Sequence, residues 1–169
     1  PVNRRGHPSA TDPWLLDGRI GGVGATSLIG YGESGKSMLA LAVALTVSTG
    51  RAGFLGVGPR VEGPALYLDW EADQDTHERR TAQLCSAINQ PAPEHLLYRQ
   101  ERLPLWRSVT ALTRHIATEG VVLLIVDSVM LARGGEQSAF SPESTLQLYA
   151  ALRTLGPPAL LVDHRTKHG

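Results

Sequence analysis

Short apolar runs alternate with longer helical stretches along most of the chain, which is the pattern of a parallel sheet covered by helices on both faces. The clearest strand is 121–126, a run of six β-branched or leucine residues that is too short for a helix. Shorter runs predict further strands at 25–29, 65–70, 96–99 and 159–162. Helices are predicted at 36–48, at 75–88, at 108–118 with Ser108 as its cap, and from the cap Ser141 to about Gly156. The pattern predicts an α/β fold, a three-layer α/β/α sandwich with a mainly parallel sheet.

The length of 169 residues suits one domain with a single core. Residues 1–12 contain few apolar side chains, which predicts a flexible arm or linker before a domain at 13–169. Because the chain ends directly after a candidate motif, we expect this domain to be incomplete at its C-terminus.

Charge and cysteine content limit the classes of partner. Sixteen basic and sixteen acidic residues cancel, so any contact with nucleic acid must be local. No apolar run reaches transmembrane length, and we expect no membrane partner. The single cysteine, Cys85, cannot form an internal disulfide and has the neighbours of a buried helix face. These features lead us to expect a cytoplasmic protein.

Lysine is rare in this chain, since Lys36 and Lys167 are the only two among sixteen basic residues. The first lies in GYGESGKS at 30–37, a complete G-x-x-x-x-G-K-[ST] phosphate-binding loop between a predicted strand and a predicted helix. Its glycines allow a tight turn whose N–H groups point inward, Lys36 neutralises phosphates and the Ser37 hydroxyl ligates magnesium. The residues expected to hold a nucleotide are Gly30, Gly32, Glu33, Ser34, Gly35, Lys36, Ser37 and Met38.

Two other predicted strands end in carboxylates. Asp127 follows the clearest strand and can hold magnesium through water, completing the metal site that Ser37 begins. Glu71 is the preferred general base for an attacking water, because active-site residues of open parallel sheets gather just past strand ends. Asp69 and Asp73 compete for this role. Period-two alternation places Asp69 and Glu71 on the same side, so spacing does not choose between them.

His164 follows the last predicted strand in the same way. An imidazole within reach of a γ-phosphate can report whether that phosphate is present. Because all strands of a parallel sheet end at one edge, Gly30, Glu71, Asp127 and His164 should converge there. The convergence supports a phosphate site more strongly than any single motif does.

These segments resemble the RecA-like ATPases, and within them the RepA-type replicative helicases and related AAA_25-like proteins of plasmids and phages. The resemblance covers about 14–167 and rests on Trp14-Leu15-Leu16-Asp17-Gly18, GYGESGKS, Phe54-Leu55-Gly56, LYLDWEAD, VVLLIVDS and VDHRTKHG. The last segment is similar to the family's H-H-x-x-K signature. The chain departs from the family pattern at Asp163, which replaces the first histidine, and at Trp70, where a small residue is common.

The resemblance implies ATP and Mg2+ as ligands, ATP hydrolysis, and a sheet with the strand order 3-2-4-5-1. It implies that Lys36 and Ser37 bind phosphate and magnesium. Glu71 is then the catalytic glutamate, Asp127 the Walker B aspartate and His164 the γ-phosphate sensor.

The resemblance also implies partners. Lys167, with Arg165 as its competitor, matches the finger that reaches into a neighbouring subunit of a hexameric ring, so an isolated subunit should be nearly inert. The segment of about Ala132–Phe140, which includes Arg133, has the position of the first loop that faces single-stranded DNA, but it carries little charge and also fits a mobile connector.

Three functions remain open. The leading hypothesis is the ATPase core of a ring-forming replicative DNA helicase or related motor. The second is a nucleotide-gated regulatory ATPase, a RecA-like switch that binds DNA or a protein partner without unwinding. A small-molecule kinase is disfavoured, because Glu71 and the C-terminal His-x-x-Lys suit attack by water, and no lid segment is recognisable.

Overall fold

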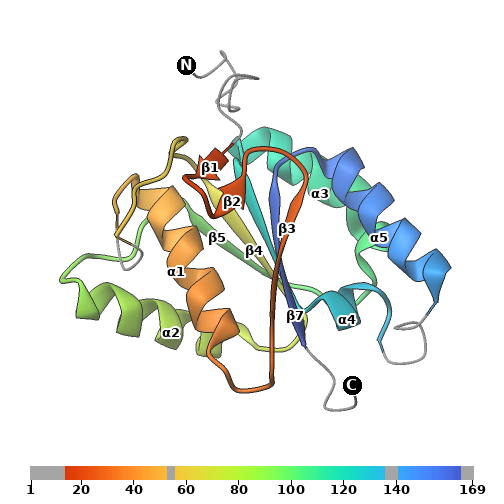
Figure 1. Cartoon of the computed structure of the whole chain (residues 1–169), viewed down its shortest axis with the longest axis horizontal. Helices are drawn as coiled ribbons and strands as arrows, with labels where there is room; N and C mark the ends of the chain where they lie inside the picture. Colours follow the sequence, from red (N-terminus) through yellow and green to blue (C-terminus); the bar gives the residue numbers. More distant parts are fainter. Residues whose placement is uncertain (1–13, 53–55, 136–140, 165–169) are drawn as a thin grey trace.

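The computed structural model describes residues 14–52, 56–135 and 141–164. Its centre is a five-stranded parallel sheet with the order β3-β7-β6-β4-β5 (Figure 1). The strands are β3 (Ala25–Gly30), β4 (Ala65–Asp69), β5 (Leu96–Gln100), β6 (Leu123–Asp127) and β7 (Ala159–His164). The helices are α1 (Lys36–Thr49), α2 (Gln74–Ala87), α3 (Leu105–Glu119), α4 (Val129–Ala132) and α5 (Pro142–Leu155). The α/β class and the implied strand order are both confirmed.

The register of the sheet sets which residues meet at its carboxyl edge. Gly30 of β3 pairs with His164 of β7, and Asp69 of β4 pairs with Asp127 of β6. The last strand in the sequence, β7, lies between the phosphate-loop strand and β6. Four segments far apart in the sequence therefore end side by side.

Helices cover both faces of the sheet, with α1 and α2 on one side and α3 and α5 on the other (Figure 1). Alternate residues of each central strand belong to different cores: Tyr67 and Ile125 pack on the α1 side, Leu66 and Leu124 on the α3 side. Every residue of β4 and β6 is buried, which explains why these strands read as continuous apolar runs. Cys85 is buried in the first core, as its neighbours predict.

Three elements differ from the sequence-based expectation. A short hairpin of β1 (Trp14–Leu16) and β2 (Ile20–Gly21) packs beside α1, and its strands are too short to show any period. The four-residue helix α4 is missed for the same reason. The third helix begins at Leu105 after Pro104, so Ser108 is not its cap. Ser108 lies inside the helix, where its hydroxyl donates a hydrogen bond to Glu101 Oε2 at 3.0 Å.

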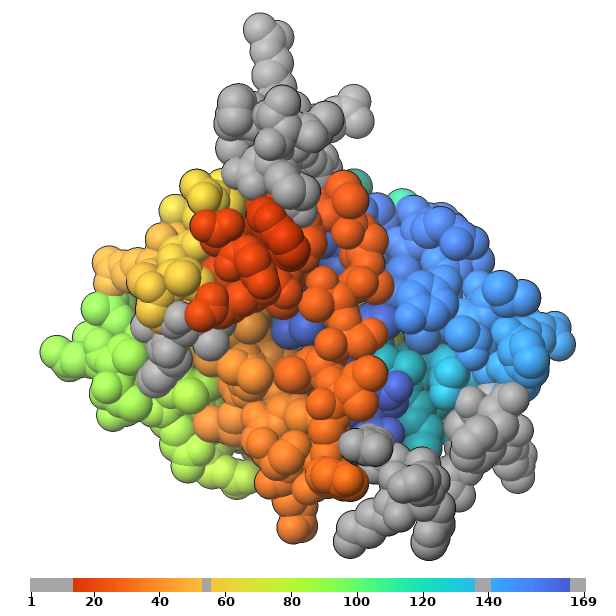
Figure 2. Space-filling view, in the orientation of Figure 1, coloured from red at the N-terminus to blue at the C-terminus, as the bar shows by residue number. Residues whose placement is uncertain are grey.

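The remaining helix starts follow the sequence. Ser141 has the cap position of α5, although in the described residues its hydroxyl makes no capping hydrogen bond. Asp73, a competitor for the role of base, is the cap of α2, since its Oδ1 accepts the Thr76 N–H at 2.9 Å. None of the described helices is both long and apolar enough to cross a membrane. Figure 2 shows β3 and the loop after it at the surface, in orange. The residues of β3 are exposed or half-buried.

Candidate nucleotide and hydrolysis site

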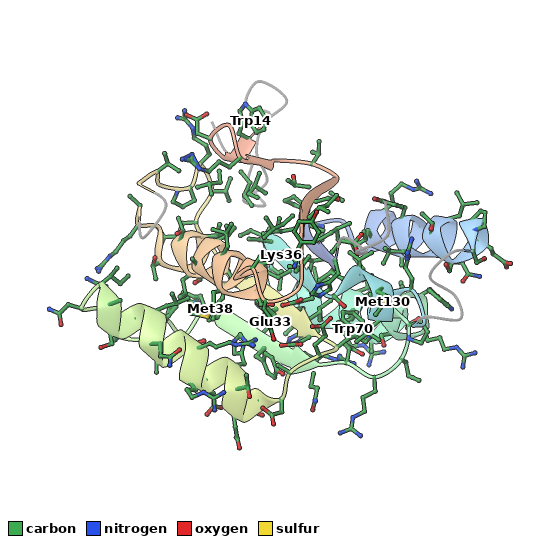
Figure 3. The ribbon with its side chains drawn as sticks, turned by 60° about the horizontal axis from the view of Figure 1, so that its bottom comes forward. Trp14, Glu33, Lys36, Met38, Trp70 and Met130 are labelled. Carbon is green, nitrogen blue, oxygen red and sulfur yellow. The ribbon has the colours of Figure 1, made fainter. Side chains whose placement is uncertain are left out.

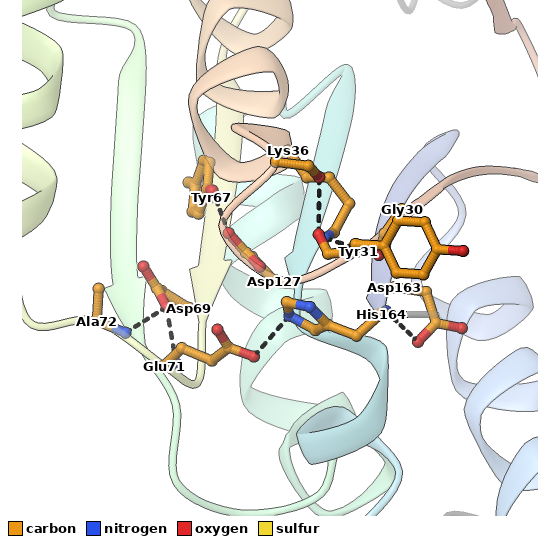
Figure 4. A network of polar contacts seen from close by, with 11 residues as sticks. Gly30, Tyr31, Lys36, Tyr67, Asp69, Glu71, Ala72, Asp127, Asp163 and His164 are labelled. Atoms are coloured by element: carbon orange, nitrogen blue, oxygen red, sulfur yellow. Dashed lines mark hydrogen bonds and ion pairs between the residues drawn. The ribbon is translucent and has the colours of Figure 1, made fainter. Parts of the chain in front are cut away.

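The loop after β3 curls around the side chain of Lys36. The Lys36 ammonium donates to the carbonyl oxygens of Gly30 at 3.0 Å and Tyr31 at 2.6 Å (Figure 4). Ser34 Oγ donates to the same Tyr31 oxygen at 2.7 Å. Gly35 caps α1 with a φ of 81°, a left-handed conformation that suits glycine. The loop therefore has the turn, the ammonium and the helix N-terminus that a phosphate site needs.

Asp127 at the end of β6 lies next to this loop. It is 2% exposed, and its Oδ2 accepts a hydrogen bond from the Tyr67 hydroxyl at 2.6 Å (Figure 4). The same hydroxyl lies 3.4 Å from the carbonyl oxygen of Ser37, at the start of α1. Burial, followed by the charge of Asp127, raises the pKa of Tyr67, so the phenol stays protonated and remains a donor. Tyr67 thus links Asp127 to the phosphate-loop helix.

Asp69 and Glu71 have different environments despite their spacing. Asp69 is 1% exposed, and its Oδ1 accepts the N–H groups of Glu71 at 2.9 Å and Ala72 at 2.8 Å. Burial raises its pKa to about 6, with the two backbone hydrogen bonds acting in the opposite direction. The Glu71 carboxylate instead lies past the strand end, with a side-chain exposure of 39%. Asp69 shapes the turn, whereas Glu71 is open to a substrate.

His164 at the end of β7 reaches across to Glu71. Its Nε2 lies 3.2 Å from Glu71 Oε1, and Figure 4 shows the imidazole between the phosphate loop and this carboxylate. The backbone N–H of His164 donates to Asp163 Oδ1 at 2.9 Å. The two side chains come from positions 93 residues apart in the sequence, so this contact depends on the fold and not on any local turn.

Behind the carboxylates, His77 of α2 lies between two tyrosines. Its ring packs edge-on against Tyr67, with centroids 5.0 Å apart, and stacks on Tyr98 at 4.2 Å. Burial, with the charge of Arg80, lowers the His77 pKa to about 4. Burial also raises the pKa of Tyr98 to about 12, and its hydroxyl donates to the carbonyl of Ala72 at 3.0 Å. This aromatic column supports both Asp127 and the turn that carries Glu71.

The family model for AAA_25, described as an AAA domain, matches residues 1–169. The chain belongs to the AAA_25 family. Membership supports nucleotide binding and a P-loop ATPase. No curated protein matches the chain.

The AAA_25 site fits a magnesium nucleotide. In the described part of the chain, the buried Asp127 Oδ1 has no hydrogen-bond partner. A buried carboxylate oxygen without a partner is suited to binding a cation or a water molecule on that cation. No three His, Cys, Asp or Glu side chains gather into a metal cluster within residues 14–52, 56–135 and 141–164. Magnesium in nucleotide sites usually combines one or two carboxylates with phosphate oxygens and water.

The fold of this AAA_25 domain brings most of the expected residues to one edge, with Lys36, Glu33 and Met38 on the loop and first turns of α1 (Figure 3). The expected finger residues Lys167 and Arg165 lie outside the described residues. Of the expected DNA loop, residues 136–140 also lie outside them, and residues 132–135 form the end of α4 and the turn after it. Sequence reasoning missed Tyr67 and His77. A tyrosine inside an otherwise apolar strand was the available signal, because a buried phenol usually needs a hydrogen-bond partner.

Proposed function

We propose that this chain binds Mg-ATP and hydrolyses it as the motor core of a ring-forming replicative DNA helicase. The observation that carries the hydrolysis proposal is the contact of Glu71 with His164 beside the phosphate loop. Family membership supports the ATPase, and the resemblance to RepA-type helicases supports the ring, the DNA and the fingers Lys167 and Arg165.

Each proposed role follows from the position of a side chain. Lys36 exchanges its two carbonyl contacts for phosphate oxygens, and the N-terminus of α1 adds its positive dipole. Ser37 and Asp127 hold magnesium, which supplies charge neutralisation of the phosphates when bound. Tyr67 keeps Asp127 Oδ2 occupied, so that Oδ1 is the oxygen that faces the cation.

Glu71 accepts a proton from the attacking water, and its exposure gives it access to that water. His164, which contacts Glu71, is the proposed γ-phosphate sensor. In this proposal, a γ-phosphate competes with Glu71 for the imidazole, so nucleotide binding releases the Glu71 carboxylate for catalysis. Asp69 is placed to shape the turn and is not the base in this proposal.

The hydrolysis proposal is tested with Glu71→Gln in the assembled protein. Loss of a general base lowers a rate by about 10²- to 10⁴-fold, so ATP turnover should fall by that factor while binding of a fluorescent ATP analogue is kept. Glu78→Gln, an exposed change on α2, is the matched control. Normal turnover by Glu71→Gln contradicts the assignment of the base.

A second experiment separates the helicase from the regulatory switch. The assembled protein should unwind a forked DNA duplex in the presence of ATP, and Lys36→Ala should not. Hydrolysis without any unwinding contradicts the helicase and favours a nucleotide-gated switch.

A further inference from the structure

A second cleft opens beside the nucleotide site at the carboxyl edge of the sheet. It lies between the ends of β4 and β5 and the turn after α4, and its volume is about 410 Å³. That volume is within the range of roughly 300–1,000 Å³ found for ligand pockets. Its lining includes Trp70, Gln100, Arg102, Leu131, Gly134 and Gly135. The proposed hydrolysis uses none of these side chains.

Trp70 forms a fixed aromatic wall of this cleft. Its indole Nε1 donates to the carbonyl of Leu103 at 2.9 Å, and its backbone N–H donates to the carbonyl of Asp127 at 2.7 Å. The ring is half-buried and packs against the core under α3. Figure 3 labels Trp70 at the end of β4 and Met130 in α4, and Leu131 of the same helix lines the cleft with Trp70. The orientation of the indole is thus set before any ligand arrives, which lowers the entropy lost on binding.

Gly134 and Gly135 border the cleft on the side of α4. Both have positive φ, at 98° and 82°, so they occupy a conformation that glycine tolerates and most residues do not. A Cβ built on Gly135 meets no atom of the described residues within 4 Å. Trp70 and the two glycines thus line one cleft from different elements of the fold.

The charged residues that line the cleft are Arg102 and Glu101. The segment 99–107 contains three arginines and one glutamate, and Arg99 Nε pairs with that glutamate, Glu101, at 2.6 Å. Arg102 is exposed and lines the cleft, with no ion-pair partner among the residues that the structure describes. An unpaired guanidinium beside an aromatic ring suits an anionic ligand that also has a flat apolar face.

We propose that this cleft binds a base of single-stranded nucleic acid, stacked on Trp70, with the adjoining phosphate on Arg102. Stacking on an aromatic side chain and pairing of phosphates with basic ones are the two general means of binding single strands. The choice of partner rests on the proposed function, but the site itself does not. Because Trp70 directly precedes Glu71, a bound strand lies one residue from the proposed base.

The test measures binding of a fluorescent single-stranded oligothymidine to the full chain by anisotropy, over a range of salt concentrations and without ATP. Loss of one stacked base weakens binding about 5- to 150-fold, so Trp70→Ala should show a loss in that range. Trp70→Phe, which keeps a ring, should lose less. Arg102→Ala should lower the slope of log affinity against log salt by about 0.7, the value for one phosphate contact on a single strand. Arg114→Ala, an exposed arginine elsewhere on α3, should leave affinity and slope unchanged.

An abasic oligonucleotide of the same length separates stacking from charge. Trp70→Ala should leave its affinity unchanged, whereas Arg102→Ala should weaken it. If Trp70→Ala weakens binding of the abasic strand as much as binding of oligothymidine, stacking is contradicted. If both variants bind oligothymidine as tightly as the parent, or if the parent does not bind it, the proposed site is wrong. Binding of a fluorescent ATP analogue by every variant is measured in parallel, so that failure of this cleft is distinguished from failure of the ATPase proposal.

Discussion

Replacing Asp69 by asparagine should make the protein more stable near neutral pH. The carboxylate is buried under the sheet edge, and its pKa is raised from 3.8 to about 6 by that burial. An acid whose pKa is raised in the folded state stabilises the fold fully below its unfolded pKa, and this contribution is lost as the pH rises through the folded value. Asp69 therefore disfavours the fold progressively between about pH 4 and pH 6.

The magnitude follows from the size of the shift. A raise of roughly 2 pKa units, at 1.36 kcal/mol for each unit, gives about 3 kcal/mol. Asparagine keeps an oxygen that can accept the N–H groups of Glu71 and Ala72, and it does not titrate. Between about pH 4 and pH 6, the free energy of unfolding of Asp69→Asn should therefore rise by about 3 kcal/mol relative to that of the parent.

Urea denaturation at a series of pH values, with EDTA and without nucleotide, measures this difference. Asp75→Asn, an exposed change in the first turn of α2, is the control and should follow the parent curve. His77 titrates equally in all three proteins, so its effect cancels. A curve for Asp69→Asn that runs parallel to the parent would refute the reasoning. The same variant should retain ATP turnover if Glu71 is the base, and lose it if Asp69 is.

Four more changes test other parts of the site. Tyr67→Phe removes the hydrogen bond to the Asp127 carboxylate, so urea denaturation should show a loss of about 1.5–3 kcal/mol, and titration of the nucleotide complex should show weaker Mg2+ binding; an unchanged Mg2+ affinity contradicts the positioning role. The pKa of His77 is lowered from 6.5 to about 4, so its contribution to stability is complete above about pH 6.5 and falls by up to about 3 kcal/mol as the pH drops through 4. In urea denaturation at a series of pH values, His77→Phe should therefore lose less stability than the parent at acid pH. An equally steep loss in both proteins contradicts this role of His77. Lys36→Ala should abolish binding of a fluorescent ATP analogue, whereas Lys167→Ala should spare binding and remove only turnover that depends on assembly; loss of binding in Lys167→Ala rules out the finger.

The sequence predicts the sheet well because its central strands are buried on both faces. A short, continuous apolar run such as Leu123–Val126 does not have the spacing of an amphipathic helix, and β4 is similarly short and buried throughout. The strand order came from family resemblance, since periodicity gives no information about which strands are neighbours. The hairpin β1–β2 and α4 are too short for any period to be visible.

The site was harder to predict than the fold. Period-two alternation places Asp69 and Glu71 together only while the strand continues, but β4 ends at Asp69 and the chain turns there. The Tyr67 hydroxyl reaches a carboxylate 60 residues away on the neighbouring strand. Such partners depend on strand adjacency, which no local pattern contains. Likewise, the cap role of Ser108 failed because Pro104 starts the helix earlier and Glu101 uses the hydroxyl.

The site has two separate sets of contacts, one around Tyr67 and one between Glu71 and His164. The Tyr67 hydroxyl donates to Asp127 of β6 and lies next to the Ser37 carbonyl at the start of α1, so it links the residues proposed to bind phosphate and cation. The side chains of Glu71 and His164 are each about one-third exposed, and among the described residues they contact one another across the opening. In the proposed ATPase, the catalytic pair can then change its contacts while the residues around Asp127 keep theirs.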